Sequence, residues 1–124
     1  MQSMIYVGIG GFIGACLRYA VSLYSSKMLG TQFPYGTLIV NITGGILIGL
    51  IMELSFNTDL IPPNMRLFLT TGIMGGLTTF STFSYETINL LSDGEYLIGV
   101  LNICLNVFLS LFGVIAGRSI AHFI

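Results

Sequence analysis

Charged residues are scarce in this sequence. Only 7% of the 124 residues are Asp, Glu, Lys or Arg, whereas a soluble domain carries about 25%. With 54% hydrophobic residues, the chain cannot cover a water-facing surface with charges, which excludes an ordinary soluble domain. The formal net charge of −1 provides no basic patch and argues against nucleic acid as a partner. The composition therefore indicates an integral membrane protein.

Residue types that carry enzyme and redox chemistry are also few. The two cysteines, Cys16 and Cys104, stand in apolar runs without CxxC spacing, so we expect free thiols packed as small hydrophobic groups. The single histidine, His122, has no nucleophile–base arrangement around it in the sequence, which argues against an enzyme. No basic segment precedes a small-residue cleavage site, so no removable signal peptide is expected.

Four apolar segments are long enough to cross a bilayer, which takes about 20 residues. They cover approximately residues 4–23, 35–54, 66–91 and 96–122. Charges and helix breakers gather in the connections, and Pro34 and Pro63 each precede a span, where proline suits the start of a helix. We therefore predict an all-α membrane protein, a single domain over residues 1–124 with four transmembrane helices.

The orientation of these spans is poorly marked. Arg66 and Arg118 would lie on one side of the membrane and Lys27 on the other, a weak bias for the positive-inside rule. Two interpretations stay open: a single, poorly marked orientation, or dual topology, in which copies insert both ways and pair antiparallel.

Glycines recur at helical spacing in three of the predicted spans. The pairs lie four residues apart, and small residues at this spacing let helix backbones approach closely; they are Gly10 and Gly14, Gly45 and Gly49, and Gly113 and Gly117. The contacts could lie within one subunit. Because three of the four spans carry a face lined by small residues, the pattern favours a homodimer.

Two spans carry polar stripes. Thr37 and Asn41 are four apart in the second span, and Asn102, Asn106 and Ser110 are four apart in the fourth. Asparagine in hydrocarbon is costly without a partner or water. Hydrogen bonding between helices would satisfy it, but a stripe on each of two helices favours a polar track beside a pore.

Arg18 and Glu86 are the ionisable groups within the first and third spans. Arginine keeps its proton in proteins, so Arg18 must reach the interface, face water or meet an acid. At the mouth of an anion pathway it would attract anions. Glu86 would be paired, protonated or in a water-filled vestibule.

The stretch "GGLTTFSTFSYE", residues 75–86, predicts a break in the third span. Residues 72–79 contain three glycines and two threonines, which disfavour helix. A helix broken at membrane depth frees backbone groups and is tolerated only where it is buried or lines a cavity. Freed carbonyls suit a hard cation such as Na⁺.

Two phenylalanines follow the predicted break. Phe80 and Phe83 are three apart and share a helix face, and Ser81, Thr82 and Ser84 stand among them. An aromatic ring has a positive edge, so the ring edges are able to contact a small anion without holding it tightly. Plain packing is the alternative for this pair.

These motifs resemble the fluoride channel family often called Fluc, or CrcB in bacteria. The resemblance covers essentially the whole chain and is carried by "GGFIGACLRY", "GTLIVNITGGILIG", "GGLTTFSTFSYE" and the asparagine-bearing fourth span. It implies an antiparallel homodimer in a bacterial cell membrane, with two fluoride pores and one central, structural Na⁺ per dimer. Such channels export fluoride passively and protect the cell from a weak acid that enters as HF.

The resemblance also implies roles for particular residues. The backbone carbonyls of Gly75 and Thr78 would hold the Na⁺. The pore would be lined by Phe80, Phe83, Asn41, Ser81 and Thr82. Further positions follow from helical stripes or from single matching residues, namely Ser110, Thr37, Arg18 and Glu86. It assigns no role to Asn102 and Asn106.

Two other functions compete with a channel. A proton-coupled dual-topology exporter of organic cations would need a titrating carboxylate deep in its first span, where the only ionisable group is Arg18. A structural subunit without a transport role would not explain a broken third helix.

Overall fold

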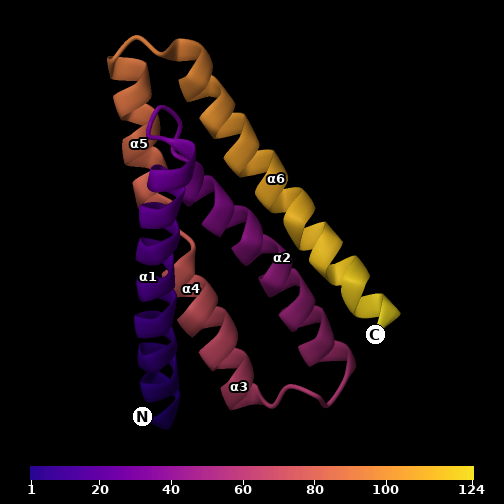
Figure 1. The fold of residues 1–124 in the computed structure, drawn as a ribbon. Helices are drawn as coiled ribbons and strands as arrows, with labels where there is room; N and C mark the ends of the chain where they lie inside the picture. The colour runs from indigo at the N-terminus through magenta and orange to yellow at the C-terminus, as the bar shows by residue number, and fades with distance from the viewer.

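The computed structural model describes all 124 residues, and its regular structure is entirely helical. Three helices are each long and apolar enough to cross a membrane: α1 (Gln2–Leu29), α2 (Tyr35–Asn57) and α6 (Tyr96–Phe123). The third span is a row of shorter pieces: α3 (Pro63–Leu67), the π-helix η1 (Phe68–Met74), α4 (Gly75–Leu77) and α5 (Ser81–Ser92). Figure 1 shows these pieces following one another along one path. The prediction of four spans with an interrupted third is confirmed.

The helices extend beyond the apolar segments that predicted them. α1 continues to Leu29, and α3 begins at Pro63, because backbone hydrogen bonding carries a helix past the point where hydropathy falls. Gly30 ends α1 with a φ of 86°, and its N–H still donates to the carbonyl of Ser26. A positive φ favours glycine, which has no Cβ. Hydropathy thus located the spans but not the ends of the helices.

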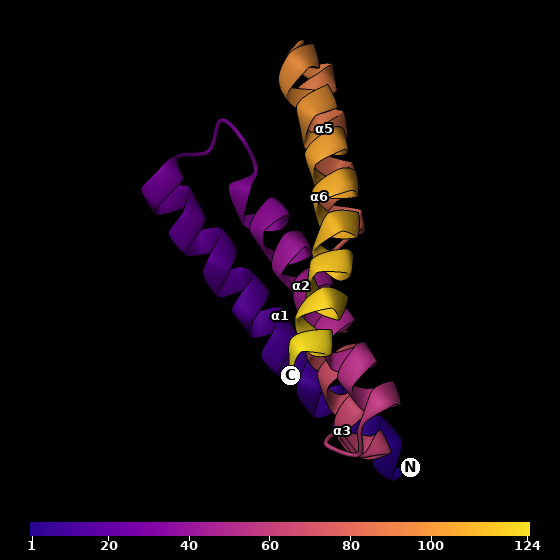
Figure 2. The ribbon, with the colours of Figure 1, turned by 90° about the vertical axis from the view of Figure 1, so that its right-hand side faces the viewer.

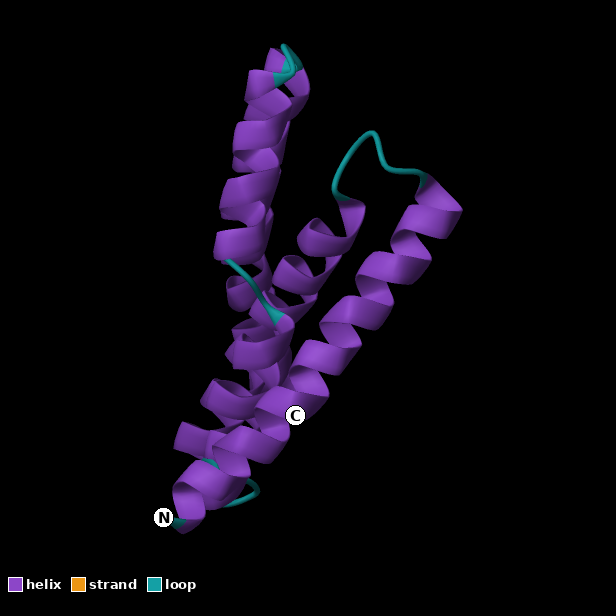
Figure 3. Cartoon of the chain, turned by 90° about the vertical axis from the view of Figure 1, so that its left-hand side faces the viewer, coloured by secondary structure: helices purple, strands orange, loops and turns teal.

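Two groups of helices, α1 with α2 and α5 with α6, diverge from a common base in which all the spans pack together. α6 packs along α2, while α1 packs against η1 and α4. α5 contacts α6 and α2 but not α1. Figure 2 shows the pair α5 and α6 leaning away from α1 and α2, and Figure 3 shows the teal interruption of the third span near the point of divergence. The break therefore lies where the groups of helices meet.

The glycine pairs pack within the subunit. A Cβ on Gly10 would lie 2.5 Å from the carbonyl oxygen of Phe68, and one on Gly45 would lie 2.7 Å from that of Ser110. Gly117 likewise sits against the carbonyl of Ile46. These distances leave no room for a side chain, so the glycines let α1 approach the third span and α2 approach α6. These pairs therefore serve packing within the subunit, the first of the two interpretations, and the homodimer stays a prediction that they do not test.

The bundle is thin. Only 22 of the 124 residues are buried, and the buried apolar cluster consists of Val40, Met74 and Leu77. Large hydrophobic side chains are exposed along every long helix. Such a surface is stable only against lipid or another apolar partner, which agrees with a protein that crosses the bilayer several times.

Candidate functional site

The third span is interrupted at Thr78, Thr79 and Phe80. Thr78 has an extended backbone, with φ of −82° and ψ of 160°, and the helix resumes at Ser81. The hydroxyl of Thr78 donates to the carbonyl of Met74 at 2.9 Å. The hydroxyl of Thr79 accepts the backbone N–H of Thr82 at 3.1 Å, as an N-cap residue does. The two threonines therefore close the helix ends on either side of the break.

The break lies downstream of the glycines that predicted it. Residues 72–77 remain helical, although they contain the three glycines. A Cβ on Gly72 would lie 2.9 Å from the Cα of Gly10, and one on Gly76 would lie 2.6 Å from the carbonyl oxygen of Gly11. Tertiary contact with α1 thus outweighs the low helix propensity. Two of these glycines serve close packing, and the threonines that follow mark the break.

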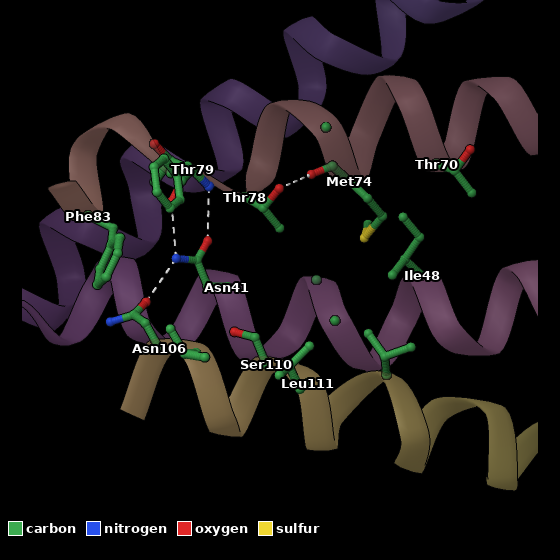
Figure 4. Close-up of a pocket in the computed structure, with 16 residues that line it drawn as sticks. Asn41, Ile48, Thr70, Met74, Thr78, Thr79, Phe83, Asn106, Ser110 and Leu111 are labelled. Carbon is green, nitrogen blue, oxygen red and sulfur yellow. Dashed lines mark hydrogen bonds between the residues drawn. The ribbon is translucent and has the colours of Figure 1, made fainter. Parts of the chain in front are cut away.

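Asn41 holds the backbone of the break from the neighbouring helix. Its Oδ1 accepts the N–H of Thr79 at 2.9 Å, and its Nδ2 donates to the carbonyl of Thr79 at 3.1 Å. The same Nδ2 donates to Oδ1 of Asn106 on α6 at 2.9 Å. Figure 4 shows these three hydrogen bonds meeting at the Asn41 side chain. Because both amide hydrogens already have partners, Asn41 acts in this structure as a brace for the break.

The break also leaves backbone carbonyls free. No hydrogen bond within the chain ends on the carbonyl oxygen of Gly75 or Thr78. Gly75 is exposed, and a Cβ there would meet only the Thr70 carbonyl oxygen, at 3.7 Å. The carbonyl oxygen of Gly76, which lies between them in the sequence, is paired: it accepts a hydrogen bond from Nε of Arg18 at 2.9 Å. Two unpaired, neutral backbone oxygens are the ligand type that a hard monovalent cation takes.

A pocket of about 630 Å³ lies beside the break. Asn41, Phe80, Phe83, Asn106 and Ser110 line it, together with apolar residues of α2 and α6. The rings of Phe80 and Phe83 have centroids 5.6 Å apart and are tilted by 55°, a common aromatic pair geometry. Phe83 is 8% exposed and Phe80 79%, so one ring is fixed in the subunit and the other stands free on its surface.

Ser110 offers a hydrogen-bond donor to this pocket. Its hydroxyl oxygen is buried and has no partner in the chain. A buried polar group without a partner costs free energy, which a ligand, a water molecule or a partner subunit would recover. Ser110 thus stands out from Asn41 and Thr78, whose polar hydrogens are already used.

The other predicted site residues are distributed more widely. Ser81 and Thr82 begin α5 and do not line the pocket at the break. Thr37 and Glu86 line a second pocket of about 310 Å³, near the loop that joins α1 to α2. Arg18 donates to the carbonyl of Gly76 in α4, just before the break. The predicted site residues therefore fall mainly in two places, the pocket beside the break and the outer pocket. Arg18, Ser81 and Thr82 line neither.

Sequence reasoning missed Thr79 and left Asn106 unassigned. Thr79 bonds to Asn41 through its backbone, and side-chain chemistry gives no signal for such a contact. Asn106 lies on the predicted polar stripe of the fourth span, so the spacing identified it, but its partner on α2 depends on how the helices cross. The sequence thus predicted that Asn106 lies on a polar face but assigned it no role.

These features define a class: a polytopic helical membrane protein in which an interrupted helix places free backbone groups beside a pocket at membrane depth. Irregular backbone at this depth is typical of proteins that pass ions or small solutes. Residues 5–118 match the model of the family described as "CrcB-like protein, Camphor Resistance (CrcB)". The chain belongs to the CrcB family.

Its relatives carry a common name. The chain is 60% identical over 120 residues to "Fluoride-specific ion channel FluC" of Clostridium novyi (strain NT), an alignment covering 97% of this chain and 94% of the relative. A protein of the same name from Clostridium perfringens (strain 13 / Type A) is 58% identical over 118 residues, covering 95% and 92%. Another from Geotalea daltonii is 48% identical over 124 residues, covering 100% of both. The family that the sequence motifs indicated is confirmed.

Proposed function

We propose that this chain is a fluoride-specific ion channel of a bacterial cell membrane, which lets fluoride leave the cell passively and so relieves fluoride toxicity. The observation that carries the proposal is the 60% identity, over nearly the whole chain, to a protein named for this activity. The pocket at the break supports it, since none of its lining residues is charged. A proton-coupled exporter would need a titrating carboxylate, and neither this pocket nor α1 contains one.

Fluoride is small and strongly hydrated, so a narrow pathway has to replace its water with other donors. The Ser110 hydroxyl has no partner in the chain, and the Thr79 hydroxyl accepts a bond but keeps its own hydrogen free to donate. The edges of Phe80 and Phe83 add weaker contacts. Asn41 holds this arrangement in place, and Ser81 and Thr82 extend the polar path along α5. The hydroxyl donors replace part of the water around the anion, and the weak ring-edge contacts do not hold it tightly, so the anion is able to enter and leave.

We place one structural Na⁺ per dimer at the break. Each subunit of an antiparallel homodimer supplies the free carbonyls of Gly75 and Thr78, and exposed Gly75 lets the partner approach. A divalent ion would usually require carboxylates, and none lies in the break. When bound, the ion supplies fixed positive charge beside both pathways, which favours anions. Arg18 adds a second positive charge through its bond to Gly76.

Purified protein in liposomes tests the activity. Fluoride should leave loaded proteoliposomes far faster than protein-free liposomes, as followed with a fluoride-selective electrode. Chloride-loaded proteoliposomes are the matched control and should release their anion at the protein-free rate, because the hydroxyl donors and narrow path select the smaller ion. Fluoride release no faster than that of protein-free liposomes would contradict the proposal.

Antiparallel assembly predicts that one gene product inserts in both orientations. A cysteine in place of Asp93, in the turn between α5 and α6, should react with a membrane-impermeant maleimide in only part of the copies in intact cells. The remainder should react after permeabilisation. The background must lack Cys16 and Cys104, which are both exposed. A cysteine in place of Asp59, in the loop between α2 and α3, is the control for the opposite end. It should likewise be labelled in part of the copies in intact cells and in the remainder after permeabilisation. Complete labelling from one face at Asp93, with none at Asp59, would exclude antiparallel pairing.

A further inference from the structure

The hydrogen bonds of Asn41 continue away from the pocket. Nδ2 of Asn106 donates to the backbone carbonyl and to Oδ1 of Asn102, at 2.9 and 3.0 Å. Nδ2 of Asn102 donates to the hydroxyl of Thr87 at 2.9 Å, and this hydroxyl donates to the carbonyl of Phe83 at 2.7 Å. The side chains of Asn41, Asn106, Asn102 and Thr87, here called the amide relay, thus connect the break to the backbone of Phe83.

The backbone fixes the direction of the amide relay. At one end the N–H of Thr79 can only donate, so Asn41 must present Oδ1 to it and Nδ2 to Asn106. Asn106 must then accept with Oδ1 and donate onward with Nδ2. At the other end the Phe83 carbonyl can only accept. The bonds that lead from the Thr79 N–H through the four side chains to the Phe83 carbonyl therefore all point the same way, and bonds aligned head to tail strengthen one another.

The amide relay is buried beyond Asn41, which is only partly buried and lines the pocket with Asn106. Asn102 is 0% exposed, and Asn106 and Thr87 are each 5% exposed. A donor that loses its partner at this depth finds no replacement, so the network is satisfied as a whole or not at all. Apolar side chains could join α2, α5 and α6 without this risk. Packing alone therefore gives no reason for a directed chain of amides that begins at the break and ends at Phe83.

We propose that Asn106, Asn102 and Thr87 are positioning residues, which hold Asn41 and the Thr79 backbone in register with Phe83. None of the three has to touch the ion. Thr87 in particular does not line the pocket at the break, yet its hydroxyl anchors the far end of the network. This inference rests on the proposed function, since register between Thr79 and Phe83 matters only if both face the conducted anion.

The test uses two substitutions at Thr87 in the full dimeric protein. Thr87→Val keeps the shape and branching of the side chain but removes the hydroxyl, which leaves Nδ2 of Asn102 without a partner. Thr87→Ser keeps the hydroxyl. We expect Thr87→Val to lower fluoride efflux about tenfold and Thr87→Ser to stay within about twofold of wild type. Hydrogen–deuterium exchange should rise in Thr87→Val at residues 78–80 more than elsewhere in the chain.

Three results would overturn the proposal. Equal fluoride efflux from the valine and serine variants would remove any role for the hydroxyl. Lower efflux with exchange raised evenly along α5 and α6, or with loss of the dimer, would reduce the relay to ordinary stabilisation. Exchange at residues 78–80 that does not change in Thr87→Val would show that the two ends are uncoupled. If wild-type protein carries no fluoride, the proposed function fails, and the exchange measurement still decides whether the relay holds the break.

Discussion

Replacing Gly75 with valine is expected to abolish fluoride flux and the dimer while the isolated subunit keeps its fold. The only atom within 4 Å of a Cβ at Gly75 is the Thr70 carbonyl oxygen, at 3.7 Å, which is ordinary van der Waals contact. The subunit therefore tolerates a side chain at this position. A branched side chain would instead cover the free carbonyls and the surface on which we place the partner. The measurements are fluoride efflux, the dimer fraction by size-exclusion chromatography with light scattering, and helix content by circular dichroism.

Two other glycines provide matched controls. A Cβ at Gly8 would have nothing within 4 Å, and Gly8 is exposed on α1, away from the break, so Gly8→Val should conduct like wild type. At Gly76 a Cβ would lie 2.6 Å from the Gly11 carbonyl oxygen, so Gly76→Val should destabilise the subunit itself and lower its helix content. Wild-type efflux from a dimeric Gly75→Val protein would refute a shared cation site at this position.

The same variant tests the cation. Wild-type stability should rise with Na⁺ concentration, by about 1.4 kcal/mol for each tenfold increase above the dissociation constant, if the ion binds only the folded dimer. Thermal unfolding should therefore occur at a higher temperature in NaCl than in N-methylglucamine chloride at equal ionic strength. Gly75→Val should lose this difference. A wild-type unfolding temperature that is the same in both salts would exclude a structural Na⁺.

Replacing Phe80 or Phe83 with leucine should lower fluoride flux about 100-fold, which corresponds to about 2.7 kcal/mol in the barrier. Leucine is apolar and of similar size but has no ring edge that carries positive charge. Phe80 makes the sharper test because its side chain is 79% exposed in the subunit, so it contributes little to packing there. Phe83 is 8% exposed, and its replacement should also cost about 1–2 kcal/mol of unfolding free energy. Efflux and thermal stability, measured on the same preparations, separate the two effects.

The control for these variants is Phe12→Leu. Phe12 lies on α1, is 73% exposed and does not line the pocket at the break. Its replacement removes a ring from a similarly exposed position and should leave efflux unchanged. If Phe80→Leu and Phe83→Leu both conduct like Phe12→Leu and wild type, the ring edges of the two pocket phenylalanines have no part in conduction.

Local information in the sequence accounts for the spans and for part of the site. Hydropathy located all four membrane-crossing segments because the cost of exposing polar groups to lipid depends on composition over about 20 residues. Four-residue spacing placed Asn102, Asn106 and Ser110 on one face of α6 because the helical period is a local property. The motif around the break indicated the family, which the comparison with known proteins confirmed.

The packing partners of the glycines could not be predicted from the local sequence. Residues 72–77 have poor helix propensity, yet they remain helical because Gly72 and Gly76 fit against the backbone of α1. The glycine pair on α2 likewise packs inside the subunit, against the backbone of α6. A small residue permits close approach, but the sequence does not say which backbone approaches. That choice is made by the packing of whole helices.

The sequence by itself determined a four-span membrane protein of the CrcB family with a break in its third span. Only the tertiary structure decided that Asn41 bonds to Thr79 and Asn106, that Ser110 is left without a partner, and that Thr37 and Glu86 lie in a separate pocket. Hydropathy and helical period are fixed by neighbours in the chain. Hydrogen bonds between residues 38 and 65 positions apart depend on how helices cross and in which register, and this is set by the packing of the folded subunit.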